Sequence, residues 1–259
     1  NIQNGYNFAK KVLCTGECDM LILDEFLGVL DQKLVGDDAL ETLLAAREEN
    51  VDLILANATA PLQAAAAATS DIPVLGTSVT DYATALEISD WTGTVGTNVS
   101  GTSDLAPLDQ QAAMIKELFP DAKKVGLLYC SAEPNSVYQC DTIEGYLKDE
   151  GYEIERYAFT DTNDVTSVTQ TACDNSDVIY IPTDNTAASN TEAIANVVIP
   201  EKVPVVAGEE GICKGCGVAT LSISYYDLGY ATGEMAYKIL VEGQDVSTTA
   251  VETAKTVTK

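Results

Sequence analysis

The sequence contains no histidine among its 259 residues. Ser-His-Asp and Cys-His catalysis both need an imidazole base, and most zinc and haem sites use an imidazole ligand. The absence therefore excludes the common hydrolase mechanisms and most sites for those metals. We expect a protein that is not an enzyme and that has no catalytic residue, metal or cofactor.

Basic residues are also scarce, since 14 Lys and Arg face 40 Asp and Glu and the formal charge is −26. Such a surface repels phosphate backbones, which excludes nucleic acid as a partner. Long apolar runs are missing too, so no membrane span is predicted. The sequence begins at Asn1 without a recognisable signal peptide, and we expect a trimmed or processed, soluble form.

Seven cysteines are present at scattered spacings, which argues against a disulfide scaffold in a chain of this length. Cys213-Lys214-Gly215-Cys216 is a lone CxxC motif. It is compatible with a local disulfide, with half of a metal-binding knuckle, or with two loop thiols. Without a second CxxC or a histidine, the metal interpretation is the least favoured.

Short apolar, β-branched segments alternate with helical patterns along the chain. The expected strands are 20–26, 51–56, 72–77, 124–130, 154–159, 177–182, 203–208 and 218–224. The expected helices are 37–49, 61–69, 108–119, 136–151, 164–173, 189–198 and 226–243. This alternation predicts an α/β fold with parallel sheets covered by helices on both faces, that is, a doubly wound fold.

The chain also nearly repeats itself, because residues 51–81 align with residues 176–211. Each copy reads as a buried strand, a polar turn rich in Asn and Thr, an Ala-rich helix, a strand after proline, and a second polar turn. The repeat predicts two similar lobes. Ligands of parallel sheets bind beyond the carboxyl ends of the strands, where the helix N-termini favour anions.

Five polar turns are expected at these strand ends: NATA (57–60), TSVTD (77–81), SAEPNS (131–136), PTDNT (182–186) and GEEG (208–211). None of them contains a glycine-rich phosphate motif. Small hydroxyls, amides and a few carboxylates suit a small zwitterionic ligand. The alternative is that Asp184 or Thr186 merely caps a helix.

From about residue 51 to its end, the chain resembles the ABC-transporter substrate-binding proteins that take aromatic or similar amino acids. The resemblance lies in the segments VDLILANATAPLQAAAAAT, NVSGTSDLAPLDQQ, KVGLLYCSAEPNSVYQ, VIYIPTDNT, VPVVAGEEG and SYYDLGYATGEMAYKIL. It implies a bilobal type I periplasmic-binding fold that closes on a ligand in the interlobe cleft.

The resemblance also implies where the lobes begin and end. The three hinge crossings would be 98–104, 208–220 and the stretch after Glu242. Lobe one would comprise 1–103 and 218–243, and lobe two would comprise 104–212 and 244–259.

The ligand contacts implied by the resemblance come from both lobes. They are Thr59, Ala60, Ser78, Thr80, Glu133, Asn135, Ser136, Asp184, Asn185 and Glu209. Asp184 would hold the ammonium, and Ser136 with the backbone after Asn135 would meet the carboxylate. Tyr82, Tyr225 and Tyr226 could add ring contacts, or they could be ordinary core and surface tyrosines.

The front of the chain departs from this pattern. Residues 6–34 resemble the Walker-B region of corrinoid adenosyltransferases, with a strand ending in Asp24 and Glu25, although no Walker-A loop is present. Two alternatives therefore remain open. One is a chimeric or engineered α/β protein with little ligand binding, and the other is a nucleotide or corrinoid enzyme fragment.

The resemblance implies partners and a location as well. The partners would be a small-molecule ligand, an ABC permease and its ATPase. Natural members of the family are lipid-anchored at the extracellular face of the cell membrane.

Overall fold

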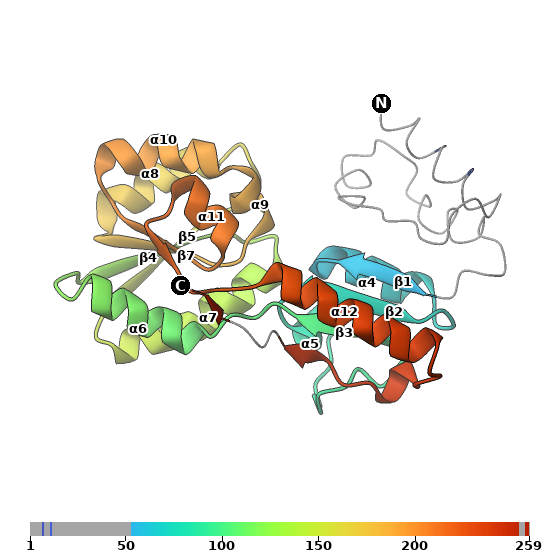
Figure 1. Ribbon diagram of the computed structural model, residues 1–259. Helices are drawn as coiled ribbons and strands as arrows, with labels where there is room; N and C mark the ends of the chain where they lie inside the picture. The colour runs from blue at the N-terminus through green and yellow to red at the C-terminus, as the bar shows by residue number, and fades with distance from the viewer. Residues whose placement is uncertain (1–6, 8–10, 12–52, 254–256, 259) are drawn as a thin grey trace. The chain divides into compact units, whose positions relative to one another are not determined.

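The computed structural model describes residues 7, 11, 53–253 and 257–258 (Figure 1). Within these residues the chain divides into two compact units. Unit 1 comprises 53–104 and 225–253, and unit 2 comprises 105–224 and 257–258. No helix among the described residues has the length and apolar character needed to cross a membrane.

Unit 1 is built on a parallel sheet whose strands follow the order β1-β2-β3-β10. The strands are β1 (Ile54–Asn57), β2 (Val74–Val79), β3 (Val99–Ser103) and β10 (Glu252–Thr253). The helices are α4 (Thr59–Ala68), α5 (Tyr82–Ala85), α12 (Tyr225–Leu240) and the 3-10 turn η1 (Val246–Thr248). Helices α4 and α5 pack on one face of the sheet, whereas α12 covers the other (Figure 1).

The alternation of side chains along β2 explains this layering. Val74 and Val79 point towards α4 and α5, whereas Leu75 packs with Met235 and Ile239 of α12. Successive side chains of a strand point to opposite faces, which separates Val74 from Leu75. Val79 returns to the face of Val74 because the pairing register of β2 with β3 shifts between Gly76 and Val79.

Unit 2 contains a five-stranded parallel sheet in the order β5-β4-β6-β7-β8. Its strands are β4 (Lys124–Cys130), β5 (Glu153–Phe159), β6 (Val178–Ile181), β7 (Val205–Ala207) and β8 (Ala219–Thr220). A separate antiparallel pair joins β9 (Ser222–Ile223) to β11 (Val257–Thr258).

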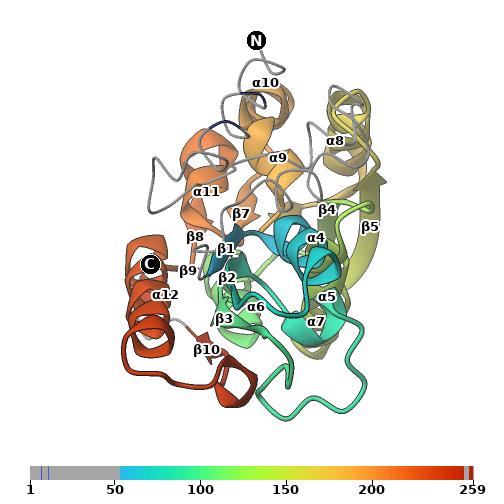
Figure 2. The same ribbon diagram turned by 90° about the vertical axis from the view of Figure 1, so that its right-hand side faces the viewer.

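Helices cover both faces of this second sheet. They are α6 (Leu108–Leu118), α7 (Pro134–Asp149), α8 (Val165–Asn175), α9 (Asn185–Ser189), α10 (Thr191–Glu201) and α11 (Glu210–Cys216). Helices α6 and α7 form one apolar layer, and α8, α10 and α11 form the other. Figures 1 and 2 show α8 and α10 side by side on the second face. The predicted doubly wound α/β fold is confirmed.

The boundaries between the units differ from the expected ones in two places. The expected second crossing, 208–220, lies within unit 2, because β8 pairs with β7. Residues 244–253 belong to unit 1 rather than to the second lobe, because β10 pairs with β3. The segment 218–224, expected as one strand, forms β8 and β9, which pair in different sheets.

Candidate ligand-binding site

The carboxyl ends of three adjacent strands in unit 2 bring together most of the residues predicted there. Strands β4, β6 and β7 are neighbours in the sheet, and each runs into a polar turn followed by a helix. Glu133, Asn135 and Ser136 follow β4, Asp184 and Asn185 follow β6, and Glu209 follows β7.

Glu133 joins the first two of these turns through its half-buried carboxylate. One oxygen, Oε2, accepts hydrogen bonds from Asn185 N (2.9 Å), Asn185 Nδ2 (2.9 Å) and Asn135 Nδ2 (3.3 Å). The other, Oε1, accepts from Thr186 N (2.8 Å) and Thr186 Oγ1 (2.7 Å). The anion at the start of α9 is therefore supplied by the protein itself.

Asp184 completes the cap of α9 from a buried position, where its exposed fraction is 1%. Its carboxylate accepts hydrogen bonds from Ala187 N (2.7 Å) and Cys130 N (2.7 Å). Burial, and then the nearby charge of Glu133, raises the pKa of Asp184 to about 6, although hydrogen bonds from Ala187, Cys130 and Ser136 oppose the shift. Of the two residues considered as caps from the sequence, Asp184 is the one that caps α9.

Gln139, which sequence reasoning missed, fixes the backbone at Thr183. Its amide donates to Thr183 O (3.0 Å) and its carbonyl accepts from Thr183 N (3.1 Å). Asn135 Nδ2 donates to the same carbonyl oxygen (3.1 Å). The sequence signal was a glutamine four residues after Asn135, on the same face of a predicted helix; the structure shows that Gln139 is buried there.

The turn at Gly208 packs directly against this backbone. A Cβ atom at Gly208 would lie 2.7 Å from Thr183 N and 2.8 Å from the carbonyl carbon of Pro182. The next residue, Glu209, caps α11 by accepting hydrogen bonds from Gly211 N and Ile212 N. Its half-buried side chain therefore lies at the same edge of the sheet as Asp184.

In unit 1, the predicted residues Thr59 and Ala60 begin helix α4, directly after β1. Thr59 is buried and Ala60 is exposed. The residue before them, Ala58, has φ 80 and ψ 168, and it supplies no side-chain cap to the helix. A residue other than glycine is rarely found in such a conformation, and strained backbone of this kind clusters at functional sites.

Ser78 is the last residue but one of β2, and Thr80 follows the strand directly. This segment, which we call the Ser78–Thr80 turn, lies beside the turn after β1 because the two strands are paired. Ser78 also has a positive φ, of 55. Thr80 is buried, and its hydroxyl donates to Asp104 Oδ1 (3.0 Å). Two strained residues thus occupy adjacent turns at the carboxyl edge of this sheet.

The capping pattern separates the helix N-termini at these edges into two groups. Helices α5, α9 and α11 are capped by the carboxylates of Asp81, Asp184 and Glu209. Helices α4 and α7 have no side-chain cap. Helices α6, α8 and α10 also begin without a side-chain cap, but α4 and α7 carry predicted ligand contacts in their first turns. Because a helix N-terminus favours negative charge, these two ends are the candidates for binding an external carboxylate.

The three tyrosines considered from the sequence have different surroundings. Tyr82 is a core residue: its hydroxyl donates to Thr102 O (3.1 Å), and its ring lies against Gly76 and Gly101. Tyr226 is 81% exposed on α12. The hydroxyl of Tyr225 donates to Asp104 Oδ2 (3.2 Å).

The CxxC motif lies on helix α11 rather than in a loop, and both cysteines are free thiols. Burial raises the pKa of Cys213, and it raises the pKa of Cys216 to about 12. In the part of the chain that the structure describes, no group of three or more His, Cys, Asp or Glu side chains could hold a metal ion. Asp24 and Glu25 lie outside the described residues.

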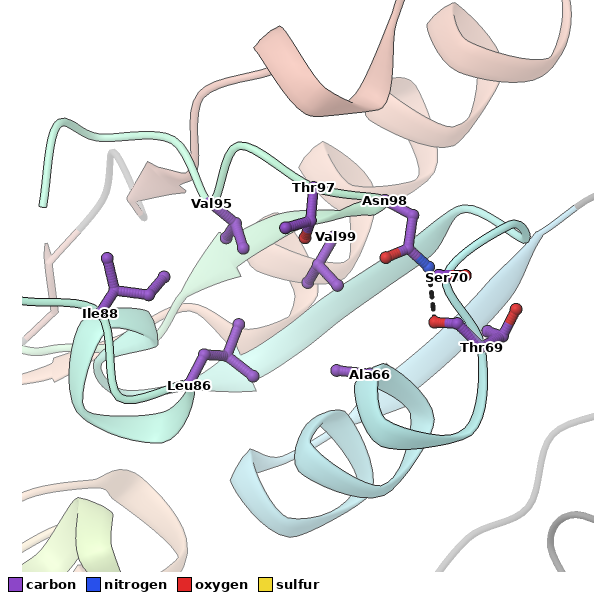
Figure 3. Close-up of a pocket in the computed structure, with 9 residues that line it drawn as sticks. All are labelled: Ala66, Thr69, Ser70, Leu86, Ile88, Val95, Thr97, Asn98 and Val99. Carbon is purple, nitrogen blue, oxygen red and sulfur yellow. Dashed lines mark hydrogen bonds between the residues drawn. The ribbon is translucent and has the colours of Figure 1, made fainter.

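A pocket of about 440 Å³ lies at the opposite end of the unit 1 sheet (Figure 3). It is lined by the apolar side chains of Ala66, Leu86, Ile88, Val95 and Val99 and by the polar residues Thr69, Ser70, Thr97 and Asn98. Asn98 donates to Thr69 O and Ile72 O, so its amide serves the local fold. None of the predicted ligand contacts lines this pocket.

Residues 36–259 match the model of the family described as ABC transporter substrate binding protein, and the chain belongs to this family. The match begins before residue 51, and it leaves out all of 6–34. It does not favour the nucleotide-enzyme interpretation, because the family is one of binding proteins.

Three relatives illustrate the similarity. A tyrosine-binding protein of Clostridioides difficile is 37% identical over 202 residues, which are 78% of this chain and 58% of that protein. An ABC domain from Streptococcus pneumoniae, solved in complex with L-Trp, is 33% identical with a TM-score of 0.78, over 84% of this chain and 74% of that one. The third is the ligand-free, open structure of a substrate binding protein with adhesive properties from Clostridium difficile. It is 38% identical with a TM-score of 0.61, over 80% of this chain and 69% of that one. The chain thus spans just over half the length of the curated relative.

Proposed function

We propose that the chain is a receptor for an aromatic amino acid. The observation that carries the proposal is its likeness to the domain in complex with L-Trp, at 33% identity and a TM-score of 0.78. The name of the tyrosine-binding relative supports the same ligand class. The receptor delivers its ligand to an ABC permease and its ATPase from the extracellular face of the membrane, where a lipid anchor holds the native form.

The ligand carboxylate is proposed to bind the start of helix α4. The backbone N–H groups of Thr59 and Ala60 lie there without a side-chain cap, next to the strained Ala58. Ser78 in the neighbouring turn adds a hydroxyl. In unit 2, the N-terminus of α7 at Asn135 and Ser136 is the second candidate, because it also has no side-chain cap.

The ammonium group is proposed to bind an acidic side chain at the edge of unit 2, for which Asp184 and Glu209 are the candidates. Asp184 is buried and its carboxylate already accepts backbone hydrogen bonds, whereas Glu209 is half-buried. Glu209 also caps a helix, so the difference between the two carboxylates is their burial. Because the side chain of Glu209 is the more accessible, we assign the ammonium contact to Glu209, with Asn185 beside it, and give Asp184 and Glu133 the role of holding the turn.

A thermal-shift and calorimetric panel tests the ligand class. It compares L-Tyr, L-Trp, L-Phe and L-Leu with D-Tyr, tyramine, 3-(4-hydroxyphenyl)propionate and ATP. Tyramine lacks the carboxylate and the propionate lacks the ammonium, so neither of them raises the melting temperature, whereas at least one aromatic L-amino acid does. A shift with ATP and with no amino acid would instead support the nucleotide-enzyme interpretation.

Two pairs of variants test the contacts. Ala58→Asp places a carboxylate at the start of α4, where it competes with that of the ligand, so it weakens binding at least about tenfold, the effect of losing one charge-assisted contact. Ala58→Gly relieves the backbone strain and retains binding. Similarly, Glu209→Gln weakens binding more than Asp184→Asn does. The opposite order would return the ammonium contact to Asp184.

A further inference from the structure

The chain passes between the two units at three places: after Asp104, after Ser224 and after Thr253. The unit 1 ends of all three passages meet. Strand β10, which ends at Thr253, pairs with β3 so that Thr253 lies opposite Ser103. Tyr225, the first residue after the second passage, donates its hydroxyl proton to Asp104 Oδ2 (3.2 Å). Asp104 therefore lies at the first passage, contacts the second and neighbours the third.

The other oxygen of the same carboxylate faces the turn that follows β2. Asp104 Oδ1 accepts a hydrogen bond from Thr80 Oγ1 (3.0 Å), and Asp104 N donates to Val79 O (3.1 Å). Ser103 Oγ donates to Thr80 O (2.7 Å). Three hydrogen bonds thus fix the Ser78–Thr80 turn, with its strained Ser78, to the end of β3.

The burial of the Asp104 carboxylate is energetically unfavourable, because the exposed fraction of the residue is only 3%. A buried carboxylate must be hydrogen-bonded to be tolerated, and removing a partner leaves an uncompensated charge. An asparagine of the same shape could accept one of the two side-chain hydrogen bonds but not both. The carboxylate is the group that can accept from Thr80 and Tyr225 at once.

We propose that Asp104 is a positioning residue that couples the Ser78–Thr80 turn to the chain passages between the units. The two hydrogen bonds that Asp104 accepts from Thr80 and Tyr225 form a bridge. A change in the turn on ligand binding is transmitted through this bridge to the three chain segments that connect the units. The part of this inference that concerns ligand rests on the proposed function, whereas the bridge itself is independent of any ligand.

The bridge is tested first without ligand, by hydrogen exchange followed by mass spectrometry. Tyr225→Phe removes one hydroxyl outside the turn, and it increases exchange at the Asp104 amide and across 79–82 at least about fivefold, about 1 kcal/mol by the conversion of equilibrium constants. Tyr226→Phe, at the exposed neighbouring tyrosine, changes nothing there. Thr80→Val has the same effect as Tyr225→Phe, and Thr80→Ser restores protection because it keeps the hydroxyl.

A double-mutant cycle of Thr80→Val with Tyr225→Phe adds a second ligand-free readout. Non-additive unfolding free energies support the bridge, because the two side chains interact through Asp104. Additive effects together with unchanged exchange in Tyr225→Phe would overturn it. The unfolding free energy of Asp104→Asn is measured in the same way. If that variant does not fold, Thr80→Val and Tyr225→Phe still test the bridge.

The ligand arm then measures the affinity of each variant for L-Trp and L-Tyr. Asp104→Asn and Tyr225→Phe weaken binding at least fivefold, whereas Tyr226→Phe does not. Equal affinities in wild type, Asp104→Asn and Tyr225→Phe would overturn the coupling. If the wild-type protein binds neither amino acid, the proposed function fails, and the ligand-free experiments still decide whether the bridge exists.

Discussion

The carboxylate of Glu133 accepts both the backbone N–H and the hydroxyl of Thr186 on a single oxygen, at 2.8 and 2.7 Å. Glu133 stands at the N-cap position of α7, yet it supplies no side-chain cap to that helix. Its charge is instead placed at the N-terminus of α9. A carboxylate therefore occupies the anion-favouring N-terminus of α9, whereas the N-terminus of α7 has no side-chain cap.

Glu133→Gln tests the strength of this connection. The amide that replaces one carboxylate oxygen cannot accept hydrogen bonds from the N–H groups of α9, so about two of the five hydrogen bonds are lost. We expect the free energy of unfolding to fall by about 1–3 kcal/mol in urea titrations. Glu117→Gln, at an exposed position of α6, is the matched control and changes stability by less than about 0.5 kcal/mol. Equal effects at the two positions would contradict the assigned role of Glu133.

The pH dependence of stability tests the environment of Asp184. Its pKa is raised to about 6, above the value of about 3.9 in the unfolded chain. The native state therefore binds this proton more tightly, and the contribution of Asp184 to stability is greatest below pH 4 and is lost as pH rises through 6.

We expect Asp184→Asn to remove this component. The difference in unfolding free energy between wild type and variant changes in favour of the variant between pH 4 and 7, by on the order of 2 kcal/mol. Denaturant titrations at several pH values measure it, and Asp71→Asn, at an exposed site, serves as the control. A pH-independent difference would mean that Asp184 has the same pKa in both states.

Tyr180 and Gln111 form a fully buried pair in unit 2. The Tyr180 hydroxyl donates to Gln111 Oε1 (2.6 Å), while Gln111 Nε2 donates to Gly208 O (3.1 Å) and Leu221 O (2.8 Å). Tyr180→Phe leaves a buried acceptor without its partner, so we expect a loss of about 1–3 kcal/mol of stability. Tyr146→Phe, on the exposed side of α7, provides the comparison in thermal and chemical unfolding. A neutral Tyr180→Phe would indicate that water replaces the hydroxyl.

Gly101 tests the packing of the unit 1 sheet. Its φ is +145, and a Cβ atom would lie 2.1 Å from Gly76 O and 2.3 Å from the Tyr82 hydroxyl. Gly101→Ala is therefore expected to cost about 3 kcal/mol or more, from overpacking together with strained backbone. Gly145→Ala, in open space on α7, should instead stabilise the protein by up to about 1 kcal/mol. If the melting temperatures of Gly101→Ala and Gly145→Ala both rose, or both fell, the described packing at Gly101 would be refuted.

Much of the fold follows from local patterns in the sequence. The four residues of β6 are all buried and belong to alternate faces of the sheet, as a continuous apolar run predicts. Strand β3 escaped assignment as a strand because its residues, VSGTS, are small and mostly polar, although all five are buried. Their burial depends on partners far along the chain, such as Tyr82 and Thr232, which bond to Thr102.

The sequence predicted that the candidate site residues lie at strand ends, but it did not predict the hydrogen bonds between them. Polar turns at strand ends indicated Asp184 and Glu209, since parallel strands gather such turns at one edge, whereas Glu133 came from the family resemblance. Which of these carboxylates the protein uses for its own helices depends on side-chain directions across different strands. For the same reason the sequence could not separate the half-buried Glu209 from the buried Asp184.

The pairing of β10 with β3 has a consequence for the order in which the protein is made. The unit 2 sheet draws its five strands from residues 124–220, and most of its core is available as soon as that stretch has been synthesised. Unit 1, by contrast, needs α12 and β10, which follow the unit 2 strands in the chain. Residues 53–104 must therefore wait until the strands of unit 2 have been synthesised, and Leu75 lacks its partners Met235 and Ile239 until α12 has followed them.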